Sequence, residues 1–149
     1  MSIEHDIQSK FRGEHHKIMV NLIYTYNWAM EKSKRFFEKA DLTPQQFNIL
    51  RILRGAAKPL STLQIRQRML DRMSDTSRIV DRLLKKELVQ KGVCKGDRRL
   101  VDITISDKGS QLLLELDNYN EEMDAVLSAI NEEEAKTLNH LLDKLRGSA

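Results

Sequence analysis

The sequence has 149 residues and a net charge of +3 at pH 7, and this length is typical of one domain with a sizeable core. No run approaches the roughly 18 consecutive apolar residues that a membrane span needs, and charges at Glu4, Asp6, Lys10 and Arg12 exclude a secretory signal core, so we expect a cytoplasmic protein. A single cysteine, Cys94, excludes an internal disulfide bond.

Charges of the two signs are separated along the chain. Residues 61–99 hold 11 Lys and Arg against 5 Asp and Glu, a net charge of +6. Residues 106–149 hold 4 against 10, a net charge of −6. A merely solvated surface does not ordinarily separate its charges in this way, so the basic stretch is predicted to face a polyanion.

A long amphipathic helix is predicted over residues 7–39, which contain no proline and a single glycine, Gly13. The apolar residues that recur at helical spacing are Phe11, Ile18, Leu22, Tyr26 and Met30. The chain restarts at Thr43, which forms a capping box with Gln46, and Pro44 takes the first helical position. This second helix is predicted to run to about Arg54 and to stop at Gly55, with Phe47, Leu50 and Leu53 turned inward.

Residues 61–106 are predicted to form a winged helix-turn-helix. Ser61 and Gln64 make a capping box that fixes the start of a short helix. After a turn at residues 70–73, a second helix covers about residues 74–86. Its predicted core residues are Thr76, Ile79, Val80 and Leu83, which share one side.

The opposite side of this second helix carries the predicted DNA contacts. They are Ser74, Asp75, Ser77, Arg78, Arg82 and Lys85, and Asp81 lies on the same side. Short hydrogen-bonding groups lie near the helix start and cations lie along its length. This distribution is typical of a helix that reads bases with its first turn and binds phosphates with the rest.

A basic hairpin follows, because two β-branched runs at residues 89–94 and 100–105 flank a turn at Gly96 and Asp97. The tip presents Lys95, Arg98 and Arg99 on a backbone thin enough to reach a minor groove. Asp97 is interpreted as orienting an arginine through a bidentate pair. Since successive strand residues point to opposite sides, Arg98 and Arg99 cannot both enter one groove.

This unit resembles the MarR family of bacterial transcriptional regulators. The residues that carry the resemblance are Pro59-Leu60-Ser61, Ile65, the run from Ser77 to Leu83, Leu88-Val89 and, above all, the run from Asp97 to Gly109. The match covers about a third of the chain. It implies a homodimer that binds a pseudo-palindromic operator in double-stranded DNA, with the helix from Ser74 in the major groove and Arg99 in the minor groove. Arg66, Leu70 and Glu87 stand where the family usually has a small residue, a turn glycine and a helix-ending glycine.

Two helices are predicted after the hairpin. Ser106 caps a long helix whose apolar residues step by 4, 3, 4, 3 and 4, which is coiled-coil spacing, and Asn131 caps a last helix. The predicted dimerisation residues are Leu112, Leu116, Tyr119, Met123, Leu138, Leu142 and Leu145. The alternative is a monomer in which the apolar stripes of all three long helices close on one another.

The expected fold is therefore mainly α-helical with a small β-hairpin wing. Residues 1–149 form a single domain, in which about 43–106 are the winged helix-turn-helix and about 1–40 and 107–149 are dimerisation helices. No cofactor is expected. The histidines His5, His15, His16 and His140 lack the spacing of a metal site, and Cys94 is interpreted as a small strand residue.

The expected function is that of a homodimeric transcriptional repressor. Tyr24, Tyr26 and Trp28 are either core or interface residues, or one wall of a pocket for the small aromatic or phenolic effector that the family resemblance implies. An alternative function is a winged-helix protein-protein interaction module without specific DNA binding. An enzyme has no nucleophile, base and orienting residue that the sequence can place together.

Overall fold

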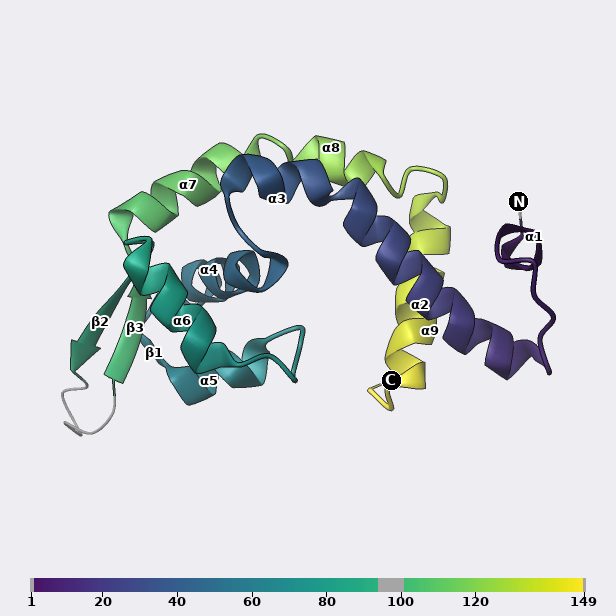
Figure 1. Ribbon diagram of the computed structural model, residues 1–149, viewed down its shortest axis with the longest axis horizontal. Helices are drawn as coiled ribbons and strands as arrows, with labels where there is room; N and C mark the ends of the chain where they lie inside the picture. Colours follow the sequence, from purple (N-terminus) through teal and green to yellow (C-terminus); the bar gives the residue numbers. More distant parts are fainter. Residues whose placement is uncertain (1, 94–100, 149) are drawn as a thin grey trace. The chain divides into compact units, whose positions relative to one another are not determined.

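The computed structural model describes residues 2–93 and 101–148 (Figure 1). They divide into two compact units. The first joins the N-terminal residues up to Lys34 with the C-terminal residues from Glu121, and the second covers Arg35–Asn120. The predicted fold class is confirmed, because the chain is mainly helical and has one small antiparallel sheet.

The second unit holds the winged helix-turn-helix. Its helices are α3 (Lys34–Ala40), α4 (Pro44–Ala56), α5 (Thr62–Arg68), α6 (Thr76–Lys85) and α7 (Asp107–Asp117). Its strands are β1 (Leu60–Ser61), β2 (Val89–Val93) and β3 (Val101–Ile105), in the order β1-β3-β2. Leu60 pairs with Ile103, and Val93 pairs with Val101, so the short strand β1 adds a third member to the predicted hairpin.

One apolar core joins every layer of this unit. Its fully buried residues come from α4, β1, α5, α6, β3 and α7, and they are Ile49, Leu50, Leu60, Ile65, Val80, Leu83, Ile103 and Leu113. Phe36 and Phe37 of α3 meet Phe47 of α4 edge to face, with ring centroids 5.1 and 5.8 Å away. Burial of this apolar area is the dominant favourable term in the folding of the unit.

Three of the predicted helix starts, at Thr43, Ser61 and Asn131, are confirmed by their capping hydrogen bonds. Thr43 Oγ1 accepts the Gln46 N–H at 3.1 Å, and Gln46 Oε1 accepts the Thr43 N–H at 3.1 Å. Ser61 and Gln64 form the same reciprocal pair, as do Asn131 and Glu134. Each capping box satisfies two backbone donors that the first helical turn leaves without partners.

The prediction of one helix over residues 7–39 is wrong. The structure has α1 (Ile3–Asp6), then α2 (Glu14–Lys32) after Gly13, and then α3 from Lys34. At Ser33 both the backbone N–H and the side-chain Oγ donate to the carbonyl of Ala29. A serine hydroxyl that binds a carbonyl four residues back slightly destabilises a helix and often bends it, which favours a break at this position.

The prediction of one long helix after the hairpin is also wrong. Helix α7 ends at Asp117, α8 covers Asn120–Ala125, and α9 covers Glu132–Leu145. Between α8 and α9 the backbone bonds reach back three residues, as from Leu127 to Asp124 at 3.0 Å. A turn of three residues does not keep 4-3 spaced side chains on one face, so the predicted coiled-coil stripe is broken.

The helix that follows Thr43 is predicted to stop at Gly55. In the structure α4 continues to Ala56, and Ala57 takes the left-handed conformation with φ 51°. Gly55 has open space where a Cβ would stand, so nothing in the packing requires the helix to end there. The remaining difference of two residues is of the size by which helix ends usually vary.

At Gly109 of α7, packing excludes a side chain. A Cβ there would lie 2.2 Å from the carbonyl oxygen of Leu88 and 2.9 Å from Cγ1 of Ile105. The same Leu88 carbonyl accepts the Ser106 N–H at 3.0 Å. The first turn of α7 therefore lies directly against the chain segment that leaves α6.

We expect Gly109→Ala to lower the free energy of unfolding by about 2–3 kcal/mol, because the backbone must move to admit the methyl group. Gly55→Ala is the matched control, since it is also a helical glycine but has open space around it. That variant should be neutral or more stable by up to about 1 kcal/mol. Urea unfolding followed by circular dichroism measures both, and equal effects would contradict the packing role of Gly109.

Candidate nucleic-acid interface

Helix α6 has one buried and one exposed face. Thr76, Val80 and Leu83 are buried and Ile79 is half-buried, in agreement with the predicted core side of this helix. The exposed face carries the side chains of Ser77, Arg78, Asp81, Arg82 and Lys85. Three cations and one hydroxyl thus point into solvent from a helix whose other side is fixed in the core.

The start of this helix differs from the prediction, because α6 begins at Thr76 instead of residue 74. Asp75 is the capping residue, and its Oδ1 accepts the N–H of Arg78 at 3.2 Å. Ser74 is half-buried and its Oγ donates to the carbonyl of Asp71 at 2.7 Å. Ser74 and Asp75 therefore precede α6 and stabilise its start. The spacing of apolar residues cannot tell such preceding residues from the first turn of the helix.

The turn before α6 is held by side chains. The N–H of Leu70 donates to Asn48 Oδ1 on α4 at 2.9 Å. The N–H of Met73 donates to Asp71 Oδ1 at 3.0 Å, and the N–H of Ser74 donates to the Asp71 carbonyl at 3.3 Å. These bonds satisfy backbone donors that the turn would otherwise expose, so the turn has a defined conformation.

The exit of α6 contains a strained residue. Glu87 adopts φ 59°, the left-handed conformation that favours glycine. The N–H of Leu88 donates to the Leu83 carbonyl and that of Glu87 to the Leu84 carbonyl, each at 3.0 Å, which is the Schellman pattern. Ser106 Oγ donates to the Glu87 carbonyl at 2.7 Å, and such bonds offset the roughly 1 kcal/mol cost of a left-handed non-glycine residue.

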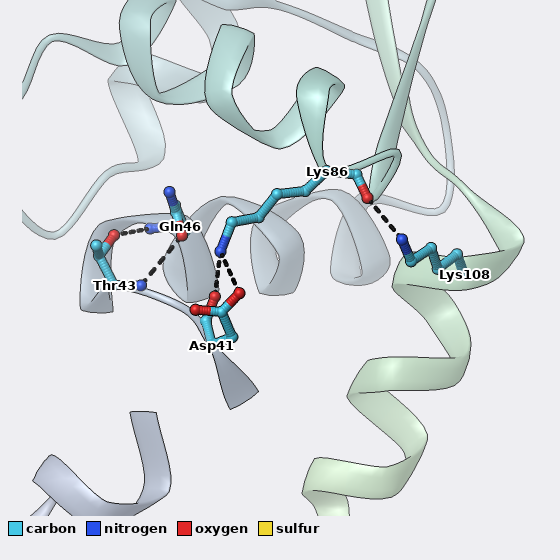
Figure 2. A network of polar contacts seen from close by, with 5 residues as sticks. All are labelled: Asp41, Thr43, Gln46, Lys86 and Lys108. Atoms are coloured by element: carbon cyan, nitrogen blue, oxygen red, sulfur yellow. Dashed lines mark hydrogen bonds and ion pairs between the residues drawn. The ribbon is translucent and has the colours of Figure 1, made fainter. Parts of the chain in front are cut away.

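A polar network anchors the same end of α6 (Figure 2). Lys86 Nζ donates to the carbonyl of Asp41 and lies 3.2 Å from Asp41 Oδ2. Lys108 Nζ donates to the Lys86 carbonyl at 3.0 Å. Asp41 stands two residues before the capping residue Thr43, so the network ties the end of α6 to the start of α4 and to α7.

Sequence reasoning missed this network and the turn contact of Asn48. Asp41 and Lys86 are 45 residues apart, and Asn48 and Leu70 are 22 apart. No local pattern marks such pairs. Only the departure at Glu87, where a glycine is usual, indicated that the helix exit needed support from elsewhere in the chain.

The β-hairpin continues from this anchored end. Lys91 Nζ of β2 lies 3.6 Å from Asp81 Oδ1 of α6, so an ion pair joins the strand to the exposed face of the helix. The predicted tip contacts Lys95, Asp97, Arg98 and Arg99, and also Cys94, lie outside the described residues. Their roles remain predictions from the sequence.

The first unit contains a cavity of about 630 Å³ between α1 and α2. Its lining residues are Ser2, Ile3, Asp6, Lys17, Asn21, Tyr24, Thr25 and Trp28. Tyr24 and Trp28 thus line it as an aromatic wall, whereas Tyr26 is exposed outside it. Lys17 donates to Glu4 across the gap between the two helices, and this hydrogen bond holds the pKa of Glu4 at about 2.

Large apolar side chains are exposed on α2 and α9, the two long helices of the first unit, which lie in the segments predicted to dimerise. On α2 they are Ile18, Met19, Leu22, Ile23, Tyr24, Tyr26 and Trp28, and on α9 they are Leu138, Leu141 and Leu145. In contrast, Leu116 of α7 is buried in the core of the second unit. The ring of Tyr119 lies under the ammonium group of Lys39 at 4.5 Å.

No helix within residues 2–93 and 101–148 is long and apolar enough to cross a membrane. In this described part of the chain, no group of three or more His, Cys, Asp or Glu residues is placed to hold a metal ion.

A short helix, a fixed turn, a cationic second helix and an antiparallel hairpin define a winged helix-turn-helix of the DNA-binding kind. The comparisons with known proteins agree. The model of the MarR family matches residues 40–100. The HTH-type transcriptional regulator MhqR of Bacillus subtilis is 27% identical over 131 residues, which are 87% of this chain and 89% of that protein.

Solved structures share the fold. A MarR variant from Escherichia coli complexed with operator DNA has a TM-score of 0.81 at 19% identity, covering 92% of this chain and 99% of that one. The organohalide-sensing regulator RdhR in its 2,4-dichlorophenol-bound form has a TM-score of 0.83 at 21% identity, covering 94% and 86%. Over its DNA-binding unit, residues 40–100, the chain is therefore similar to the MarR family of winged helix-turn-helix transcriptional regulators.

Because of the Glu4–Lys17 pair, we expect the contact between α1 and α2 to weaken in acid. Because the pKa of Glu4 is lowered from 4.5 to about 2 when α1 lies on α2, the pair stabilises that contact fully above pH 4.5. The contribution falls as the pH drops from 4.5 and is lost below about pH 2. Trp28, the single tryptophan, lines the cavity with Ile3 and Asp6, so its fluorescence should report the separation of α1 in this range.

Glu4→Gln should abolish the fluorescence transition between pH 4.5 and 2, since it removes the titrating group. Asp6→Asn is the control, because it changes another carboxyl group at the cavity and should leave the transition in place. An unchanged acid titration in Glu4→Gln would show that the pair does not hold α1.

Proposed function

We propose that the protein is a homodimeric repressor that binds a pseudo-palindromic operator in duplex DNA and competes there with RNA polymerase. The observation that carries the proposal is the exposed face of α6, with Ser77, Arg78, Arg82 and Lys85 on a helix fixed at both ends. An α-helix with its side chains is about 10–12 Å across, and the major groove is about 12 Å wide, so α6 is of a size to enter it.

The proposed contacts divide along the helix. Arg78 projects from the first turn of α6, where a bidentate contact to a guanine edge is within reach. Arg82 and Lys85 lie one and two turns further on and are assigned to phosphates. Arg99 is assigned to the minor groove and Arg98 to a phosphate. The operator-bound relative from E. coli supports this type of complex.

Dimerisation is proposed to occur through the apolar faces of the first unit. Exposed residues such as Leu22 and Ile23 on α2 and Leu138 and Leu145 on α9 exceed the scattered apolar exposure of an ordinary monomer surface. A symmetric pair would cover these faces and present two copies of α6, as a pseudo-palindrome requires.

An aromatic effector is proposed to release the operator. The cavity between α1 and α2 combines the rings of Tyr24 and Trp28 with polar groups from Asn21 and Thr25, which fits a small phenol. The 2,4-dichlorophenol-bound relative supports an effector of this class. The cavity lies within the first unit.

The DNA-binding proposal is tested with duplex DNA selected from a random pool by the wild-type protein. Arg78→Ala should lose about 1–3 kcal/mol of preference at one base pair in each half-site, measured by fluorescence anisotropy on single-base variants. Arg82→Ala is the matched control on the same face. It should weaken binding to all sequences alike and reduce the slope of log K against log salt by about one per phosphate contact.

Retention of every base preference by Arg78→Ala would remove that residue from the reading set. Failure of the wild-type protein to select or bind any duplex at low salt would overturn the proposed function. The protein would then fit the interaction-module alternative.

The dimer is tested with charges placed on α9. Leu138→Glu combined with Leu145→Glu should raise the dimer dissociation constant by about 30-fold or more, because loss of an interface anchor costs about 2 kcal/mol or more. Asn139→Glu adds a carboxylate to the same helix at an exposed polar position and is the control. Light scattering over a concentration series gives the constants. Equal dimer stability in all variants would place the interface outside α9.

A further inference from the structure

Three large apolar side chains are exposed on the helix-turn-helix. Leu63 on α5 is 62% exposed, and Leu70 and Met73 in the turn are 88% and 94% exposed. Single exposed apolar residues are common on protein surfaces. Here, however, they lie beside the start of α6, the part of the helix that the proposed function brings nearest to the bases.

The exposure of Met73 belongs to an ordered turn. Its backbone N–H is bound by Asp71 Oδ1, and the following Ser74 is bound twice to the Asp71 carbonyl. Asp75, two residues after Met73, caps α6. The side chain therefore leaves the backbone from a fixed position just before the helix.

Met73 and Leu63 line one hollow on this surface. The hollow has a volume of about 470 Å³ and lies between the first turn of α5 and the start of α6. Its other lining residues are Thr62, Arg66, Ser74, Asp75, Thr76 and Ser77. Leu70 is exposed in the same turn but does not line the hollow.

The surroundings indicate the chemistry of the partner. Arg66, which lines the hollow, and Arg72, which precedes Met73 in the chain, are both exposed and favour a polyanion. The carboxylates of Asp71 and Asp75 already accept backbone N–H groups of Met73 and Arg78, which directs part of their charge toward the protein. The partner is thus an anionic surface that also offers small apolar groups.

We propose that Met73, with Leu63 beside it, contacts the 5-methyl groups of thymines in the major groove, and that this contact helps to specify the operator. The proposal rests on the proposed function. The thymine methyl is the apolar group that bases present in that groove, and apolar side chains read it by contact. Methionine suits the task because its unbranched side chain adapts to an irregular surface.

The test replaces thymine by uracil, which pairs in the same way but lacks the methyl group. Each thymine of the selected operator is substituted in turn, symmetrically in both half-sites. The wild-type protein should lose about fourfold in affinity per contacted methyl group at one or two positions of each half-site, the effect of burying one such group. Affinity is measured by fluorescence anisotropy.

Met73→Ala should bind the thymine operator more weakly and should no longer distinguish uracil from thymine at one of those positions. Met73→Leu should restore the distinction, because it restores an apolar contact. Leu70→Ala is the matched control, equally exposed in the same turn but outside the hollow, and should keep the wild-type uracil profile. Circular dichroism checks that each variant is folded.

Tight binding by the wild-type protein with no loss at any uracil position would overturn the inference and leave the proposed function standing. The inference also fails if Met73→Ala keeps the wild-type uracil profile, since the hollow would then serve another partner such as a protein. Absence of binding to any duplex would instead overturn the proposed function itself.

Discussion

The close contact between Gly109 and the carbonyl of Leu88 is the constraint on which the winged unit depends. It brings the first turn of α7 against the segment that leaves α6, where the same carbonyl accepts the Ser106 N–H. Three elements meet there: the end of α6, the strand β3 that precedes Ser106, and α7. Because the side chain of Gly109 is a single hydrogen atom, these backbones approach more closely than a Cβ would allow.

The basic residues of the second unit form two groups: some bind other parts of the unit, and others face solvent. Lys86 and Lys108 bind backbone carbonyls and Asp41, and Arg54 of α4 forms a two-point contact with Asp117 of α7 at 2.7 and 3.2 Å. These cations hold elements together. The neighbouring Lys85 and the arginines of α6 face solvent and remain available to a polyanion. Adjacent lysines thus differ in role because a helix turns each residue by 100°.

Side chains hold the turn before α6 in a defined conformation. Asn48 and Asp71 supply acceptors for its N–H groups, so exposed side chains such as Met73 project from a fixed backbone. A fixed backbone lowers the entropy lost on binding, which makes small contacts count toward specificity. The hydrogen bonds of Asn48 and Asp71 therefore hold the backbone from which the exposed side chain of Met73 projects.

The sequence by itself determined the winged helix-turn-helix, because its signals are local. Capping boxes at Thr43, Ser61 and Asn131, the 3.6-residue period of α6 and the alternating strands each act over a few residues. The structure revealed where helices break, as at Ser33 and Asp117, and the tertiary packing decided which distant residues meet, as do Asp41 and Lys86. Apolar spacing continued across the break at Asp117, so it could not reveal that break. Contacts between residues far apart in the chain depend on how the core packs, and no single stretch of sequence contains that information.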